Sequence, residues 1–119
     1  IRILNVPEDY QSIQSAIDST NDGDRVLVSA GTYFENINFN GKNIIVQGAD
    51  RETTIINGGQ NGSVVTFNSG EDTSTVLANF SITNGSGQLN HNDEWIVGGG
   101  IYVQNSYPLL TKCCKIWGL

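Results

Sequence analysis

Short stretches in which apolar and polar residues alternate follow one another along most of this chain. One set of three recurs at offsets of 39 and 36 residues, and a second at offsets of 36 and 34. Alternation places every second side chain on the same face of a strand, so each run predicts a half-buried β-strand. The first set comprises Val26–Gly31, Val65–Gly70 and Ile101–Ser106, and the second Asn43–Gly48, Asn79–Asn84 and Cys113–Gly118.

The order in which these sets recur predicts the fold class. A weaker third set, Phe39, Val76 and Leu110, repeats in the same sequence. Repeats of 20–50 residues that hold strands and no helix indicate coils stacked in parallel. We therefore predict a mainly β protein, a parallel β-helix of about three coils; a β-sandwich with chance similarity is the alternative. The predicted inward side chains are Val26, Val28, Ile44, Val46, Val65, Phe67, Phe80, Ile82, Ile101, Val103, Cys114 and Ile116.

The first part of the chain has a different period. Tyr10, Ile13, Ala16 and Ile17 recur at spacings of three and four, which predicts an amphipathic helix. We expect this helix to begin around Pro7–Tyr10, with Asp9 as its N-cap. The interpretation is a single domain, 1–119, in which residues 1–23 form an N-terminal cap with a capping α-helix and residues 24–119 form the coils.

Asn43 and Asn79 occupy matching positions in the second set. Stacked asparagines at a bend can bond to one another and to the backbone, which predicts a bend ladder. The alternative is that asparagine simply tolerates turn geometry.

The stretch IQSAIDSTNDGDRVLVSAGTYFENINFNGKNIIVQG, together with FSITNG and GGGIYVQNSYPLL, resembles secreted right-handed β-helix proteins of the pectin lyase-like superfamily. The resemblance implies a right-handed parallel β-helix in a secreted or cell-surface protein of bacterial type, with the helix covering the first coil. It also implies a longer stack, so we expect the chain to be a fragment. Glu35, on the first turn, is expected to bond to backbone and not to act in catalysis.

Charge and composition exclude some partners. Six basic and twelve acidic residues give a net charge of −6, which disfavours nucleic acid and anionic membranes. No apolar run reaches the roughly 20 residues that cross a bilayer, so no membrane insertion is expected.

Candidate chemistry is sparse. In this superfamily, catalytic carboxylates project outward from the strands. The outward positions predicted here hold no Asp or Glu: Leu27, Thr66 and Tyr102 on one sheet, and Ile45, Ser81 and Lys115 on another. The segment around His91, Asp93, Glu94 and Trp95 is the preferred ligand site, because the acids and histidine suit a divalent metal and Trp95 suits a sugar ring. For the segment itself we favour a solvated insertion loop with Trp95 folded back on the core, and the ligand site is the alternative. No catalytic residue, resident metal or cofactor is predicted, and Ca²⁺ has no defined ligand spacing to support it.

These observations favour a noncatalytic scaffold segment with a structural, adhesive or carbohydrate-contacting role and a polysaccharide as partner. Two alternatives stay open. The chain is the N-terminal part of a polysaccharide lyase or esterase of pectin type, or it is a self-assembling unit. Self-association is expected through the last coil, because an uncapped coil leaves unpaired strand edges.

Overall fold

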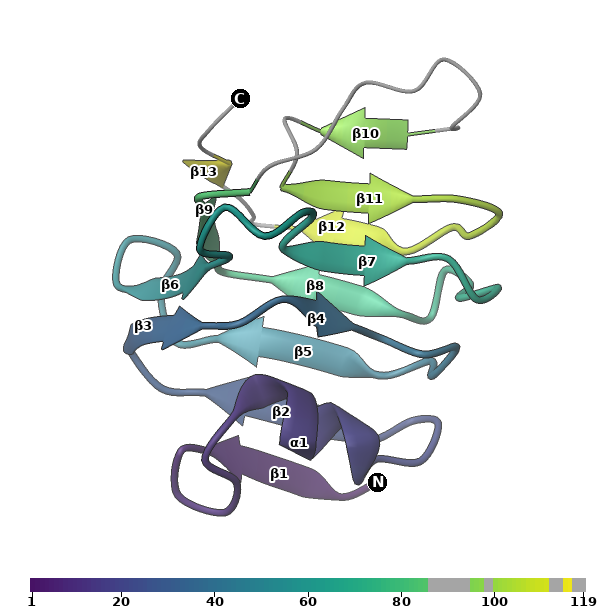
Figure 1. Ribbon diagram of the computed structural model, residues 1–119. Coiled ribbons are helices and arrows are strands. Elements are labelled where there is room, and N and C mark those ends of the chain that lie inside the picture. The colour runs from purple at the N-terminus through teal and green to yellow at the C-terminus, as the bar shows by residue number, and fades with distance from the viewer. Residues whose placement is uncertain (86–94, 98–99, 112–114, 117–119) are drawn as a thin grey trace.

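A computed structural model describes residues 1–85, 95–97, 100–111 and 115–116, with 95–97 and 115–116 described by their backbone. These residues form one α-helix and thirteen short β-strands (Figure 1). The elements, in chain order, are β1 (Ile3–Val6), α1 (Ile13–Asp18), β2 (Arg25–Val28), β3 (Gly31–Phe34), β4 (Ile37–Asn38), β5 (Ile45–Gly48), β6 (Thr54–Asn57), β7 (Val65–Phe67), β8 (Val76–Ala78), β9 (Ser81–Thr83), β10 (Trp95–Val97), β11 (Ile101–Val103), β12 (Leu109–Thr111) and β13 (Lys115–Ile116).

The strands form three sheets. Sheet A has the order β1-β2-β5-β8-β12, sheet B the order β13-β9-β6-β3 and sheet C the order β10-β11-β7-β4. Every pairing is parallel except that of β10 with β11. From β2 to β9 the chain visits sheets A, B and C in turn and then starts again one level higher, and β11, β12 and β13 continue this order after the extra strand β10 (Figure 1). The predictions of a mainly β fold and of parallel stacking are therefore confirmed.

The strand partners differ from the predicted ones in the first part of the chain. Val26 pairs with Val46 in sheet A, not with Val65, which belongs to sheet C. Val65 does pair with Ile101, and Ser81 with Lys115, as the offsets of 36 and 34 predicted. The physical reason is that alternation looks the same in all three sheets, so it identifies a strand without identifying its sheet.

The third predicted set is wrong in a similar way. Val76 pairs with Leu109, one residue before the predicted Leu110. Phe39 follows a strand of sheet C, whereas Val76 belongs to sheet A.

The second predicted set also joins residues of different sheets. Ile44 directly precedes a strand of sheet A, whereas Phe80 directly precedes one of sheet B. The first rounds are shorter than the later ones, because 20 residues separate the paired Arg25 and Ile45 and 31 separate Ile45 and Val76.

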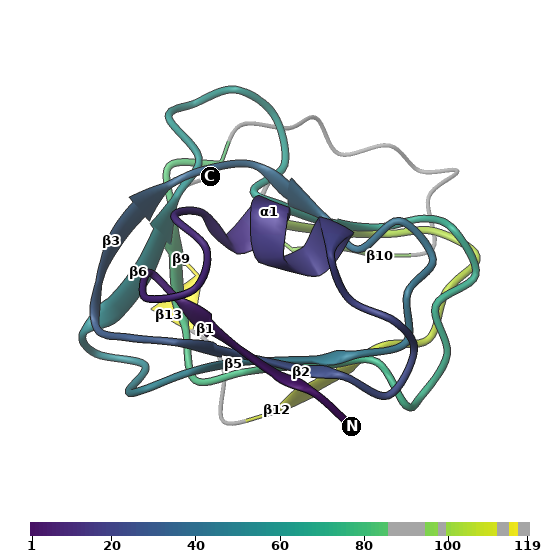
Figure 2. The same cartoon turned by 90° about the horizontal axis from the view of Figure 1, so that it is seen from below.

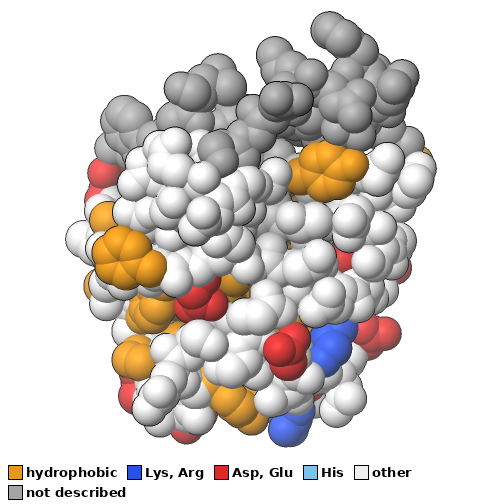
Figure 3. All heavy atoms as spheres, viewed as in Figure 1, with side chains coloured by type: hydrophobic (Ala, Val, Ile, Leu, Met, Phe, Trp, Pro, Cys, Tyr) orange, Lys and Arg blue, Asp and Glu red, His pale blue; other side chains and the backbone are white. Residues whose placement is uncertain are grey.

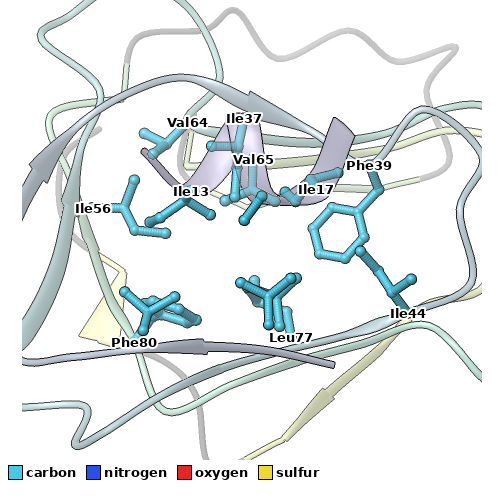
Figure 4. Packing of buried hydrophobic residues seen from close by; sticks show 14 of the residues in the cluster. Ile13, Ile17, Ile37, Phe39, Ile44, Ile56, Val64, Val65, Leu77 and Phe80 are labelled. Carbon is cyan, nitrogen blue, oxygen red and sulfur yellow. The ribbon is translucent and has the colours of Figure 1, made fainter. Parts of the chain in front are cut away.

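Apolar side chains from the three sheets and the helix meet in one core (Figure 4). Phe39 and Phe67 lie on neighbouring levels with ring centroids 4.5 Å apart. Aromatic pairs at this separation add to the stabilisation from burial. Ile13 and Ile17 on α1 are fully buried and close the core at its N-terminal end, where α1 lies across the space between the sheets (Figure 2).

The helix begins at Ile13, later than predicted. Ser12 is the N-cap and forms a capping box with Ser15, whereas Asp9 lies in the preceding turn. Ser12 Oγ accepts from the backbone N–H of Ser15, and Ser15 Oγ accepts from that of Ser12, so the capping box fixes the start of the helix directly after Ser12. The strand β1 before it was not predicted, and it makes sheet A one strand larger than sheet B.

Charged side chains from the next level hold both ends of this short helix. The carboxylate of Glu35 accepts hydrogen bonds from the backbone N–H groups of Ile13 (2.8 Å) and Gln14 (3.0 Å). The ammonium of Lys42 donates to the carbonyl oxygens of Ile17, Asp18 and Thr20 at the other end. Each charge has the sign that the helix dipole favours. The expectation that Glu35 bonds to backbone is confirmed.

Candidate functional site

The predicted ligand segment lies mostly outside the described residues. This holds for His91, Asp93 and Glu94. Trp95 begins β10, where its backbone pairs with Val103.

The predicted core positions are buried wherever their side chains are described. Their exposed fractions run from zero to 7% for Val103. Cys114 lies outside the described residues, and the backbone of Ile116 pairs with Ile82. The described buried members are Val26, Val28, Ile44, Val46, Val65, Phe67, Phe80, Ile82, Ile101 and Val103.

Asn43 and Asn79 do not form a ladder. Asn43 precedes β5, and Asn79 follows the parallel neighbour β8, so the two residues lie at opposite ends of sheet A. Asn43 accepts hydrogen bonds through its Oδ1 from Thr75 Oγ1 (2.6 Å) and from the backbone N–H of Asp72 (3.0 Å). Asn79 has a φ of 63°, which asparagine tolerates better than most residues. The alternative interpretation, tolerance of turn geometry, accounts for Asn79.

The outward rows are also distributed differently from the prediction. Leu27 lies in sheet A between Asn5 and Gln47, whereas Thr66 and Tyr102 are paired in sheet C. Ile45 belongs to sheet A, and Ser81 and Lys115 to sheet B. None of these positions is acidic, and that observation is independent of the sheet assignment.

One hollow among the described residues lies at the corner where sheet A ends and the chain turns toward sheet B. It has a volume of about 320 Å³ and is open to solvent. Its polar groups are the amides of Asn5 and Gln47 and the hydroxyl of Ser29, each from a different strand or strand end. Its walls are completed by Leu27, Val28, Gly48 and Ala49.

A second hollow of about 460 Å³ continues from the first. The two share Ala49, and the second adds Asp50, Arg51 and Asn79. Together they form a groove, which we call the corner groove, over β1, β2 and β5 and the turns that follow β5 and β8.

Gly48 lines the corner groove at a position where β5 packs closely against its neighbours. A Cβ on this residue would lie 2.3 Å from the carbonyl oxygen of Asn79 and 3.0 Å from Thr54 Cγ2. Real Cβ atoms do not approach backbone oxygen so closely, so only glycine fits where β5 ends beneath the turn after β8. Sequence reasoning missed this groove because it assigned no strand to Ile3–Val6; the alternation of Leu4 and Val6 was the available signal.

The side chains that line the Asn5 end of the groove are uncharged, and two of them donate to carboxylates beside it: Asn5 Nδ2 to Asp9 Oδ2 and the Ser29 hydroxyl to Glu8 Oε1, each at 3.2 Å. Gln47 accepts a hydrogen bond from Arg25 through Oε1 (3.2 Å), which leaves its Nε2 without a partner among the described residues. Amides and hydroxyls beside aliphatic side chains suit a ligand rich in hydroxyl groups. At the other end Asp50 accepts from the backbone N–H of Glu52 (2.8 Å), so this carboxylate is partly occupied.

The carboxylates of the described residues are engaged within the chain. Each of the ten accepts a hydrogen bond or forms an ion pair, and most of the donors are backbone N–H groups. Glu71 is the extreme case: it is fully buried and accepts from the backbone N–H groups of Gly41 and Ser69 and from the Ser106 hydroxyl, each at 2.9 Å. The ten residues are Glu8, Asp9, Asp18, Asp22, Asp24, Glu35, Asp50, Glu52, Glu71 and Asp72.

Among the described residues, no group of three or more His, Cys, Asp and Glu side chains could hold a metal ion. Within the same residues, no helix has the length and apolar character required to span a bilayer.

In comparisons with protein-family models, curated protein sequences and solved structures, nothing matches this chain. The family resemblance therefore stays a prediction, and function is argued from the geometry above.

Proposed function

We propose that this chain is a noncatalytic segment of a right-handed parallel β-helix, of pectin lyase-like type, that contacts a polysaccharide through the corner groove. The observation that carries the proposal is that charged and uncharged polar side chains occupy different places in the fold. The described acids make contacts within the chain, whereas two amides and a hydroxyl line the Asn5 end of the groove.

The cyclic order of the strands supports the β-helix part of the proposal. A chain that visits sheets A, B and C in turn, with parallel neighbours at each level, winds around the core as a coil does. A right-handed path is the expected one for parallel crossovers. An experimental structure of the chain tests this part directly, and a left-handed path would contradict it.

The uncharged lining at the Asn5 end of the groove supports a carbohydrate ligand more than a charged one. Asn, Gln and Ser side chains donate to and accept from sugar hydroxyls, and Leu27 and Ala49 offer apolar contact to the ring faces. The resemblance to secreted proteins is what suggests that the polysaccharide is met outside the cell or at its surface.

Titration calorimetry with neutral and acidic oligosaccharides tests the binding part. We expect Gln47→Ala and Asn5→Ala each to weaken binding by roughly fivefold to tenfold, which corresponds to one lost hydrogen bond. Thr66→Ala is the matched control, because Thr66 also lies half-buried on a strand but belongs to sheet C. Equal losses in all three variants would point to a different surface.

The noncatalytic part is tested with the same oligosaccharides. Lyase activity would produce unsaturated ends that absorb ultraviolet light, and esterase activity would release acid. If the purified chain turns over an oligosaccharide, and its specific activity stays constant through the last purification steps, the noncatalytic part of the proposal is overturned. The enzyme alternative is then favoured.

A further inference from the structure

At the N-terminal end of the stack, sheets A, B and C end in the edge strands β1, β3 and β4, and these differ in whether their outward backbone groups are hydrogen-bonded. An edge strand presents unpaired N–H and C=O groups, and proteins usually block or cover them. The edges of sheets A and C are each blocked at one residue, whereas no described residue blocks the edge of sheet B.

The edge of sheet A is blocked at Asn5 on β1. The backbone N–H of Asn5 donates to Asp9 Oδ2 at 3.0 Å. Its carbonyl oxygen accepts from the backbone N–H groups of Asp9 (2.8 Å) and Tyr10 (3.2 Å). The turn after β1 therefore folds back and occupies the outward-facing groups of this residue.

The edge of sheet C is blocked at Asn38 on β4. The side-chain amide of Gln14, on α1, makes both hydrogen bonds that a neighbouring strand would make. Its Oε1 accepts from the backbone N–H of Asn38 (2.7 Å), and its Nε2 donates to the carbonyl oxygen of Asn38 (3.0 Å). One glutamine thus replaces a strand beneath β4.

The edge of sheet B is β3, and it is open. Gly31 and Glu35 donate their backbone N–H groups toward β6, to Thr53 and Asn57. The backbone N–H and C=O groups of successive residues in a strand point to opposite neighbours. Those of Thr32 and Phe34 therefore point away from β6. No described residue pairs with those groups.

The side chain beside this open edge is apolar. Phe34 is 75% exposed, and Thr32 is exposed on the same face of the strand. Hydrophobic side chains reach the surface on the side of the molecule where β3 lies (Figure 3). A strand added here would pair its backbone with Thr32 and Phe34 and pack a side chain against the phenyl ring.

The charge around the open edge selects the partner. Glu8 binds the Ser29 hydroxyl just before β3, and Glu35 directly follows it. Burial, and then the nearby carboxylates of Glu8 and Glu35, raise the pKa of Tyr33 in the middle of the strand. Residues 1–41 hold six acids against Arg2 and Arg25, and neither arginine lies on β3.

We propose that β3 is a docking edge for an extended, basic peptide segment of another protein, which adds as a further strand to sheet B. This inference is independent of the corner groove. A second copy of this chain fits the edge less well, because it would bring two acidic ends together.

The test uses fluorescent peptides roughly six residues long, the usual length of a strand. One alternates Val with Lys, one Val with Thr and one Val with Glu. Fluorescence anisotropy at low salt should show that the lysine peptide binds roughly tenfold or more tightly than the glutamate peptide. The preference should shrink as salt screens the carboxylates. Equal binding of all three peptides would overturn the choice of a basic partner.

Two variants locate the site. Thr32→Pro removes an N–H that faces away from β6, so the pairing of β3 with β6 is retained while the docking edge loses a donor. It should weaken binding roughly fivefold or more, whereas Thr32→Val, which keeps the N–H, should bind as the parent does. Gln47→Ala in the corner groove should also leave peptide binding unchanged, and this separates failure here from failure of the carbohydrate proposal.

Hydrogen exchange keeps the proposal testable if Thr32→Pro does not fold. In the parent chain, the lysine peptide should slow exchange at the amides of Thr32 and Phe34 more than at Asn38. Protection confined to other strands would overturn the proposal. Concentration-dependent self-association that protects the same two amides would assign the edge to a second copy and would also overturn it.

Discussion

Glu35 Oε2 accepts a hydrogen bond from the backbone N–H of Ile13 at 2.8 Å, and this contact joins the turn after β3 to the first residue of the helix. Glu35 Oε1 makes the corresponding bond with Gln14. A helix of six residues has little stability of its own, so its position depends on such contacts and on the burial of Ile13 and Ile17.

We therefore expect Glu35→Gln to lower the free energy of unfolding by about 1–2 kcal/mol, since it removes the charge at the helix N-terminus and replaces one acceptor by a donor. Urea denaturation followed by circular dichroism measures the change. Glu52→Gln is the control, because Glu52 is exposed and its ion pair with Arg51 is long, at 3.8 Å. Equal effects of the two substitutions would show that the helix contact is not a stabilising one.

Glu71 gives a second prediction, because a fully buried carboxylate joins three levels of the stack. Its acceptors are saturated by Gly41, Ser69 and Ser106. Glu71→Gln would turn an amide N–H₂ toward a donor, so we expect a loss of about 2–4 kcal/mol in the free energy of unfolding.

Ser106→Ala provides the graded comparison for Glu71. It removes one donor to Glu71 and the acceptor of the Gly70 backbone N–H, and it leaves the two backbone donors to Glu71 in place, so a loss of about 1–2 kcal/mol is expected. Thermal unfolding of both variants ranks them. If Ser106→Ala is the more damaging substitution, the carboxylate is not the centre of this network.

The inward faces of the strands could be predicted from the sequence, because burial imposes alternation directly. Val26 and Val46 are fully buried, and the residues on either side of each are only partly buried. Their pairing could not be predicted, because the distance along the chain between levels depends on turns whose lengths vary. An offset of 20 residues in the first round and 31 in the next gives no constant period to recognise.

The corner groove could not be predicted because it depends on contacts between levels. Gly48 resembles any turn glycine in the sequence, and its requirement appears only when the carbonyl of Asn79 lies above it. Asp9 was interpreted as a helix cap because it precedes the apolar period. Its carboxylate instead binds Asn5, which belongs to a strand that was not predicted. Asn79 is distant from Gly48 in the sequence, and Asn5 lies in a strand that was not predicted, so neither contact could be foreseen.

Gly48→Ala is expected to destabilise the fold by about 2–3 kcal/mol, because the methyl group would overlap backbone and neither strand can withdraw without breaking its pairing. Gly70→Ala is the matched control. Gly70 has a φ of 81° but open space around it, so strain alone should cost about 1 kcal/mol. Chemical denaturation distinguishes the two, and a larger effect at Gly70 would argue against the close approach of Asn79.

Asp24 predicts how stability changes in acid. Hydrogen bonds from the backbone N–H groups of Asn21 and Arg2, together with the Arg2 guanidinium, hold the pKa of Asp24 below its ordinary value. Because the folded-state pKa is the lower one, protonation favours the unfolded chain. The stabilisation is present above the ordinary carboxyl pKa of about 3.9 and is lost as the pH falls through the lowered folded-state pKa. Asp24→Asn should therefore flatten the dependence of stability on pH below about 4.

Asp72 gives the same kind of prediction, since hydrogen bonds from the Ser74 side chain and backbone also lower the pKa of Asp72. Asp72→Asn, added to Asp24→Asn, should flatten the dependence of stability on pH further. Urea midpoints measured between neutral pH and strong acid test this, and parallel curves for the parent and Asp24→Asn would contradict it.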